Sequence, residues 1–143
     1  RAIEHNVLWA QWGAQRLRAL HGAGLAGDWQ EVVLVGASDL DEDDMTYQGI
    51  DQQGRARDYR DYVHADVGID TYDVVVVDGR ARNRCIERVI REDLVEPGGL
   101  LVLDDSQRER YAEGIAAVPA TWARVDYPGL SWTTTIWTRP ATA

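Results

Sequence analysis

Three positions in the sequence carry carboxylates directly after runs of apolar residues, where such groups can do chemistry. Glu4 follows the apolar start of the chain, and Asp78 follows four consecutive valines. Asp104 and Asp105 follow the run Leu100–Leu103. Carboxylates at such positions accept hydrogen bonds from ligand hydroxyls, take up protons and bind hard divalent cations. A carboxylate after a strand also caps the helix that follows it, and this alternative stays open for each position taken alone.

The segments around these acids predict strands that alternate with helices. The segment 72–79, with its four consecutive valines, indicates a central parallel strand that is buried on both faces. Apolar residues at helical spacing predict helices over 7–20 and 83–94. Shorter apolar runs predict further strands at 2–4, 31–36 and 100–105. Such alternation builds an open α/β sheet whose parallel strands end on one edge, so we expect the acids to converge there.

The remaining segments are less regular. Residues 37–57 carry an acidic run and several glycines, and we expect a solvated loop there. A short amphipathic helix is predicted around 58–64, and Ser106 is expected to cap a helix that runs through about Ala117. The tail alternates over 121–125 and 132–138, which predicts an antiparallel pair around an intervening Pro-Gly turn.

Composition limits the classes of function. The chain has 143 residues, which suits a single domain over 1–143. Its net charge is −9 and all 15 basic residues are arginine, a balance that disfavours nucleic-acid binding. No apolar run is as long as a membrane span, so no membrane partner is expected. The single cysteine, Cys85, cannot form an internal disulfide, which favours a reducing compartment and a cytoplasmic location.

Other polar residues have weaker functional interpretations. The three histidines are not spaced as a metal site, and only His5, beside Glu4, is expected near a ligand. Cys85 falls on the apolar side of its helix, which favours a buried inert thiol over a nucleophile. Arg80 and Arg82 lie near the predicted sheet edge, where they bind an anionic substrate group or are simply solvated at a helix start.

Four short motifs occur in order along the chain. They are Ile3-Glu4-His5 before a Trp-bearing helix, Asp78-Gly79-Arg80-x-Arg82-x-x-Cys85, Glu96-Pro97-Gly98-Gly99 before Leu100–Ser106, and the closing segment Trp132–Ile136. Together they resemble the class I S-adenosylmethionine-dependent methyltransferases, from that family's second strand onward. The resemblance implies a Rossmann-like open sheet, mostly parallel, with an antiparallel C-terminal strand. It also implies S-adenosylmethionine as cofactor and a small-molecule hydroxyl as the methyl acceptor.

The resemblance also implies roles for individual residues. Glu4 would accept hydrogen bonds from the ribose hydroxyls of the cofactor, with His5 nearby. An acid at that position also suits a nicotinamide dinucleotide. Asp78 would lie beside the methyl donor. Near the adenine, the resemblance places Gly36, Ala37 and Ser38.

A divalent metal is a further option under this resemblance. In the metal-dependent O-methyltransferases of the family, carboxylates at the ends of the fourth and fifth strands hold a cation. Asp78, Asp104 and Asp105 match those positions, and Asp78 and Asp104 are the candidate catalytic residues. Mg²⁺ prefers carboxylate oxygens and lowers the pKa of a bound hydroxyl. Against this, many class I relatives use no metal, and Asp105 with Ser106 would instead cap the next helix.

The sequence departs from the family at its most informative motif. No acid followed by a Gly-rich turn matches the family's first strand, and we therefore expect a methyltransferase portion whose first strand is missing. Two alternatives remain. One is a non-catalytic methyltransferase-like module for binding or assembly, and the other is a nicotinamide-dependent oxidoreductase. A small-molecule substrate is the expected partner, and a homo-oligomer is left open.

Overall fold

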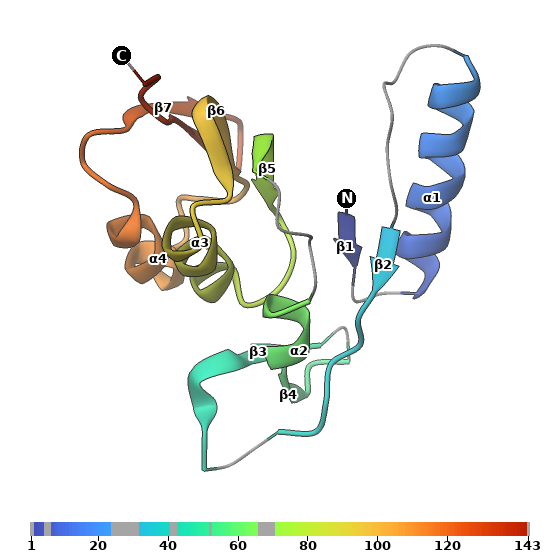
Figure 1. Cartoon of the computed structure of the whole chain (residues 1–143). Coiled ribbons are helices and arrows are strands. Elements are labelled where there is room, and N and C mark those ends of the chain that lie inside the picture. The colour runs from blue at the N-terminus through green and yellow to red at the C-terminus, as the bar shows by residue number, and fades with distance from the viewer. Residues whose placement is uncertain are drawn as a thin grey trace. The chain divides into compact units, whose positions relative to one another are not determined.

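The computed structural model describes residues 2–4, 7–23, 32–40, 43–51, 53–65 and 71–142. The chain divides into two compact units, Arg1–Gly68 and Ile69–Ala143, and each is described by itself (Figure 1). The expectation of a single domain over 1–143 stays a prediction.

The first unit begins with a strand, a helix and a second strand. Strand β1 (Ala2–Glu4) pairs in parallel with β2 (Val32–Leu34), with Ile3 opposite Val33. Helix α1 (Val7–Gly22) lies between them in the chain. The predicted helix over 7–20 is therefore confirmed, as are both strands. Parallel strands with a helix between them are the arrangement that the alternating pattern predicts.

A β-hairpin follows in the segment that the sequence predicts as a solvated loop. Strands β3 (Gln48–Ile50) and β4 (Ala56–Asp58) pair antiparallel. The Asp51 carboxylate organises the turn between them, because it accepts hydrogen bonds from the backbone N–H groups of Gln53 and Arg55 at 2.8 and 2.9 Å. The loop prediction is wrong here because strands of three residues are too short to show alternation.

Two short helical segments flank this hairpin. The 3-10 segment η1 (Met45–Tyr47) precedes it, and the Asp44 carboxylate caps η1 by accepting from the Thr46 N–H at 3.0 Å. Helix α2 (Arg60–Val63) follows the hairpin and confirms the short helix predicted around 58–64. Acidic residues of this stretch thus hold turns and helix ends in place.

The second unit is built on a four-stranded mixed sheet. In spatial order its strands are β5 (Tyr72–Val77), β6 (Val95–Leu103), β8 (Thr133–Thr138) and β7 (Ala123–Pro128). Strands β5 and β6 are parallel, whereas β8 runs antiparallel to both β6 and β7. The antiparallel pair predicted in the tail is therefore confirmed. This α/β arrangement is compatible with a Rossmann-like methyltransferase fold.

The helices of the second unit lie over one face of this sheet (Figure 1). They are α3 (Arg82–Arg91), the 3-10 segment η2 (Glu109–Tyr111) and α4 (Ala112–Ala117). The last helix begins later than predicted, because residues 104–107 form a turn. Within the described residues, every helix falls short of the length and apolarity that crossing a membrane requires.

Helix α3 ends earlier, and β6 begins earlier, than the sequence predicts. Asp93, at φ 57°, closes the helix, and the Leu94 N–H donates to the Val89 carbonyl at 3.0 Å. Strand β6 includes the Pro-Gly-Gly segment before Leu100, because a register shift relative to β5 takes up the extra residues. Gly99 is needed there, since a side chain would approach the Asp73 carbonyl oxygen to 2.8 Å.

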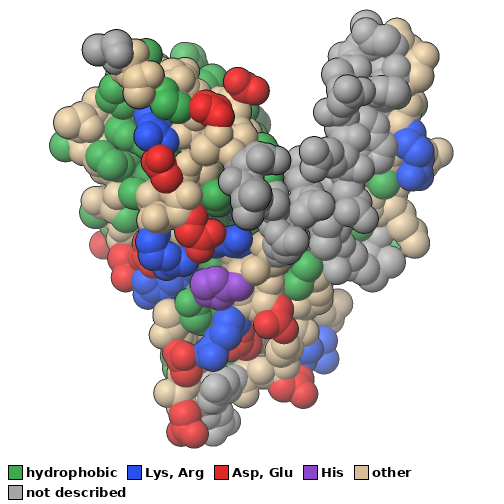
Figure 2. Space-filling model, in the orientation of Figure 1, with side chains coloured by type: hydrophobic (Ala, Val, Ile, Leu, Met, Phe, Trp, Pro, Cys, Tyr) green, Lys and Arg blue, Asp and Glu red, His purple; other side chains and the backbone are tan. Residues whose placement is uncertain are grey.

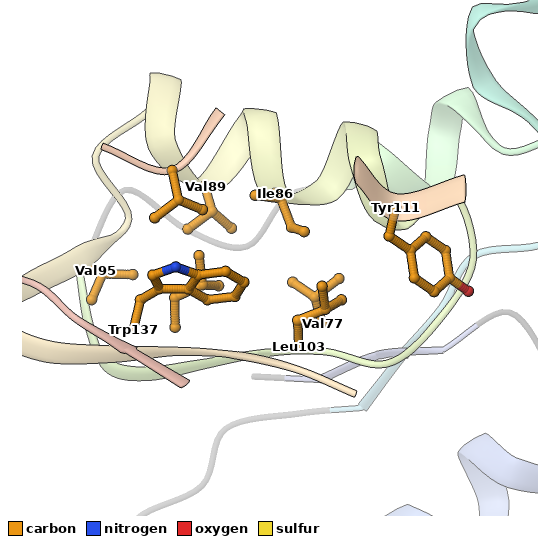
Figure 3. Packing of buried hydrophobic residues seen from close by; sticks show 9 residues of the cluster. Val77, Ile86, Val89, Val95, Leu103, Tyr111 and Trp137 are labelled. Carbon is orange, nitrogen blue, oxygen red and sulfur yellow. The ribbon is translucent and has the colours of Figure 1, made fainter. Parts of the chain in front are cut away.

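The core of the second unit lies between α3 and one face of the sheet. Ile86 and Val89 of α3 face Val77, Leu103 and Trp137 of the sheet (Figure 3). The same buried cluster includes Val95, Leu101, Tyr111 and Val118. These contacts hold α3 firmly over the ends of β5 and β6, where the predicted site residues lie.

Strand β5 is not buried on both faces, and that prediction is wrong. Val75 and Val77 pack in the core, but Val74 and Val76 are 50% and 61% exposed. Among the described strands, β5 lies at an edge of its sheet. Helix α3 packs on the face that carries Val75 and Val77, and not on the face that carries Val74 and Val76. A run of valines shows that both faces are apolar, but it does not show what covers each face.

Candidate functional site

The carboxyl ends of β5 and β6 bring Asp78 and Asp104 to one edge of the sheet. The strands are parallel with Val77 opposite Leu103, so the residues that follow them lie on the same edge. The Asp104 N–H donates to the Val77 carbonyl at 3.3 Å, which extends the pairing to the edge itself. These two acids share an edge, as the alternating pattern predicts.

A buried arginine, Arg82, binds both strand ends. Its side chain is 9% exposed, and it opens α3 after Ala81, which is in the left-handed conformation. Nη2 donates to the Asp78 carbonyl at 2.8 Å and to the Asp78 carboxylate at 2.9 Å. Nε donates to the Gly79 carbonyl at 3.1 Å, and Nη1 donates to the Asp104 carbonyl. One planar guanidinium therefore joins the ends of β5 and β6.

The other carboxylates of this edge are also engaged by the protein. Asp105, at φ 55°, has its Oδ2 2.5 Å from Arg108 Nη2 and 3.9 Å from Arg82 Nη1. The Asp104 carboxylate accepts from Thr134 Oγ1 at 2.9 Å. Within the described part of the chain, no group of three or more His, Cys, Asp and Glu side chains is placed to hold a metal ion. The edge as it stands therefore does not fit the divalent cation that the family resemblance suggests.

Asp78 is the carboxylate of this edge that is best placed to meet a ligand. Its side chain is 63% exposed, in contrast to Asp105 at 18%. Partial burial raises the pKa of Asp78, and Arg82 opposes that effect. The negative charges of Asp104 and Asp105 and a hydrogen bond with Asp104 raise it as well, so the pKa lies above the ordinary value. A carboxylate with a raised pKa is a stronger base.

Helix capping, the alternative role for these acids, is wrong. Helix α3 has Ala81 at its N-cap position and η2 has Arg108, and no side chain caps either one. Ser106, which is expected to cap the next helix, is buried, and its backbone N–H donates to the Thr133 carbonyl of β8 at 2.8 Å. Asp78 and Asp105 are held by arginine side chains instead.

Glu4 and His5, the predicted ribose-binding pair, belong to the first unit. Glu4 is the last residue of β1, in register with Leu34 of β2. It thus lies at a strand end, as the sequence predicts. His5 lies outside the described residues. Hydrogen bonding of Glu4 to a cofactor ribose stays a prediction, and so does the placement of His5 near the cofactor.

The residues predicted near the adenine follow β2 in the first unit. Ser38 forms a bridge to Asp58 of β4, with its N–H donating at 2.9 Å and its carbonyl accepting at 3.2 Å. Arg57 Nη2 donates to the Ala37 carbonyl at 3.2 Å. Gly36 is exposed, and a side chain there would meet nothing within 4 Å. The hairpin thus fixes the backbone of this segment, and its contact with adenine stays a prediction.

Cys85 and His64 each have a partner within their own unit. Burial raises the pKa of Cys85 to about 12, and its Sγ donates to the Arg80 carbonyl at 3.5 Å. This supports the predicted inert thiol. His64 Nε2 lies 2.9 Å from the Tyr47 hydroxyl in the first unit, which accounts for it without a metal.

The internal role of Arg82 is the feature that sequence reasoning missed. Arg80 and Arg82 are predicted either to bind an anionic substrate group or to be solvated, whereas Arg82 is buried and bound to the protein itself. The available signal is the spacing of four residues between Asp78 and Arg82, which allows an ion pair within one turn. On the face shown in Figure 2, acidic and basic side chains lie intermingled, and pairing of this kind recurs in both units.

No known protein family matches the sequence, and no curated protein matches it. Among solved structures, the chain is similar to a methyltransferase from Pyrococcus furiosus, with 16% sequence identity and a TM-score of 0.45. The alignment covers 97% of this chain and 61% of that protein. The chain therefore spans about three-fifths of the length of that structural neighbour.

Proposed function

We propose that this protein is an S-adenosylmethionine-dependent methyltransferase that methylates a hydroxyl group of a small molecule. Asp78 is proposed as the base that takes the proton of that hydroxyl, and Asp104 as a second polar group that orients the acceptor. Glu4, His5 and residues 36–38 are proposed for the ribose and adenine of the cofactor.

The strand order of the second unit is the observation that carries this proposal. Strand β8 runs antiparallel between β6 and β7, while β5 and β6 are parallel and end in acids. This is the arrangement that the methyltransferase resemblance implies for the C-terminal part of the sheet. A dinucleotide-binding sheet of the doubly wound type is mostly parallel and carries a Gly-rich fingerprint, so the same observation disfavours the oxidoreductase alternative.

The exposed Asp78 carboxylate suits the proton transfer that O-methylation needs. The cofactor would supply a methyl group made electrophilic by its bond to a positively charged sulfur. The acceptor oxygen would bond to that carbon, and the carbon–sulfur bond would break with its electron pair left on sulfur. The hydroxyl proton goes to the Asp78 carboxylate, whose raised pKa makes it a competent base. Because Arg82 holds one oxygen of Asp78, the carboxylate has a defined orientation at the sheet edge.

Binding of S-adenosylhomocysteine tests the proposal directly. Calorimetry is expected to show binding of this product to the wild type and to Asp78→Asn, because Asp78 acts on the acceptor. Asp126→Asn, which alters an exposed acid on β7, is the matched control and is expected to bind as the wild type does. Binding of NAD⁺ in place of S-adenosylhomocysteine would overturn the proposal in favour of an oxidoreductase. Binding of neither would favour the non-catalytic module.

A methyl-transfer assay then tests the role of Asp78. Once an acceptor is found by screening small hydroxyl compounds, Asp78→Asn is expected to lower kcat by about 10²- to 10⁴-fold, the range for loss of a general base. Wild-type activity is expected to rise with pH through the raised pKa of Asp78, since the base must be ionised. An unchanged kcat in Asp78→Asn would exclude it as the base.

A further inference from the structure

The sheet edge at β5 and β6 already contains a cation. The Arg82 guanidinium donates to three backbone carbonyls, those of Asp78, Gly79 and Asp104, and to the Asp78 carboxylate. It also lies 3.9 Å from the Asp105 carboxylate. A divalent ion that bridged these strand ends would need oxygen ligands from the same groups. The guanidinium therefore binds oxygen atoms at both strand ends, one Asp78 carboxylate oxygen among them, that such an ion would need as ligands.

Each carboxylate of the edge already has a partner in the protein. Asp78 and Asp105 are paired with Arg82 and Arg108, and the Asp104 carboxylate accepts a hydrogen bond from a threonine. Because Arg82 is buried and makes most of its bonds to backbone, its position is set by the fold. The Asp78 and Asp105 carboxylates are consequently oriented by arginines, and within the described residues the acids of this edge do not form a group of three or more metal ligands.

We propose that Arg82 is a built-in cation that takes the place of a divalent metal at this edge and positions the Asp78 carboxylate. In the wild type, the ends of β5 and β6 then neither need nor bind a divalent ion. A ligand bound at this edge meets the Asp78 carboxylate, which the Arg82 guanidinium holds in place. Replacing Arg82 with a neutral residue frees the acids and turns them into a divalent-cation site. This inference concerns ion binding and does not rest on methyl transfer.

Titration with Mn²⁺ tests the proposal without any organic ligand. Wild type, Arg82→Gln, Arg82→Lys and the control Arg88→Gln are compared. Arg88 is on the same helix, is 13% exposed and pairs with an acid four residues away, so it resembles Arg82 in burial and in pairing with an acid. We expect Arg82→Gln to bind Mn²⁺ about tenfold or more tightly than the wild type, because a positive charge next to two carboxylates is removed. Arg82→Lys and Arg88→Gln are expected to remain like the wild type.

The pKa of Asp78, measured by carboxyl-carbon NMR, provides a second readout. Arg82 lowers this pKa against the other influences, so Arg82→Gln is expected to raise it, whereas Arg82→Lys restores it in part. If the charge of Arg82 had no effect on Asp78, the pKa of Asp78 would be the same in Arg82→Gln and in Arg82→Lys.

Two results would overturn the proposal. One is Mn²⁺ binding to the wild type that Asp78→Asn abolishes, a result that stands even if Arg82→Gln fails to fold. The other is a folded Arg82→Gln variant that binds Mn²⁺ no more tightly than Arg88→Gln does. Failure of the methyltransferase proposal would appear separately, as absent S-adenosylhomocysteine binding, and would leave the metal titration unchanged.

Discussion

Replacing Arg82 with methionine is expected to destabilise the second unit far more than the same change at Arg88. Methionine keeps the length of the side chain but donates no hydrogen bond, so the carbonyls of Gly79 and Asp104 lose a charged donor. Each hydrogen bond from a charged group contributes about 1.5–3 kcal/mol. Water can replace part of the loss at the exposed Asp78. We therefore expect the free energy of unfolding to fall by about 3–5 kcal/mol, which comes mainly from the two lost hydrogen bonds to carbonyls.

Arg88→Met is the control for lost packing and lost charge. Its side chain is buried to a similar extent and pairs with the Glu92 carboxylate, whose side chain is 36% exposed, so loss of this ion pair is expected to cost about 0–1 kcal/mol. Unfolding in urea is followed by labelling of Cys85, the single thiol of the chain, which lies in α3 and so reports on this unit alone. Equal losses of stability in the two variants would refute the view that Arg82 joins the strand ends.

Three further outcomes are expected. Val76→Thr changes an exposed face of β5 and is expected to lower the free energy of unfolding by less than about 0.5 kcal/mol. Val77→Thr places a hydroxyl in the core and is expected to lower it by about 1–3 kcal/mol. Unfolding in urea measures both values. The Cys85 thiol, whose pKa burial raises to about 12, is expected to react with a thiol reagent at mildly alkaline pH only after denaturation. A hydrogen bond from Thr135 lowers the pKa of Asp126, so its contribution to stability is present above the pKa of the unfolded chain, about 3.9, and is lost as pH falls through the lower folded value. The free energy of unfolding of Asp126→Asn is therefore expected to fall less steeply than that of the wild type as the pH is lowered into the acid range. The same pH dependence in both proteins would show that this hydrogen bond does not contribute to stability.

The sequence predicts the elements well wherever hydrophobic periodicity is strong. The helix over 7–20, the strand with four valines and the antiparallel pair of the tail are all found in the structure. The hairpin at 48–58 escapes prediction because each strand has only three residues and its turn depends on one aspartate. Local pattern also fails for Val74 and Val76, since their exposure depends on what packs over the sheet.

The candidate site shows the same division between local and long-range information. That Asp78 and Asp104 share an edge follows from two parallel strands that end in acid, and this is readable from the sequence. That Arg82 binds the strand ends is not readable, because four arginines occur in α3 and only the fold shows which one reaches the ends of β5 and β6. The pattern of charges along the sequence indicates which residues could form ion pairs. Which of them are buried, and which partners they bind, is known only from the fold.

The exclusive use of arginine in this chain bears on the chemistry of the edge. Arg82 reaches the Gly79 carbonyl, the Asp104 carbonyl and both acceptors of Asp78 at once, because its donors are fixed in one plane and point in different directions. A lysine at this position has three donors on a single atom and cannot span the two strand ends in that way. Arg82→Lys should therefore restore the pKa of Asp78 in part while losing much of the stability. That split between charge and geometry is the sharpest distinction between a positioning cation and a simple counter-ion, and urea unfolding combined with NMR titration of the one variant would measure both.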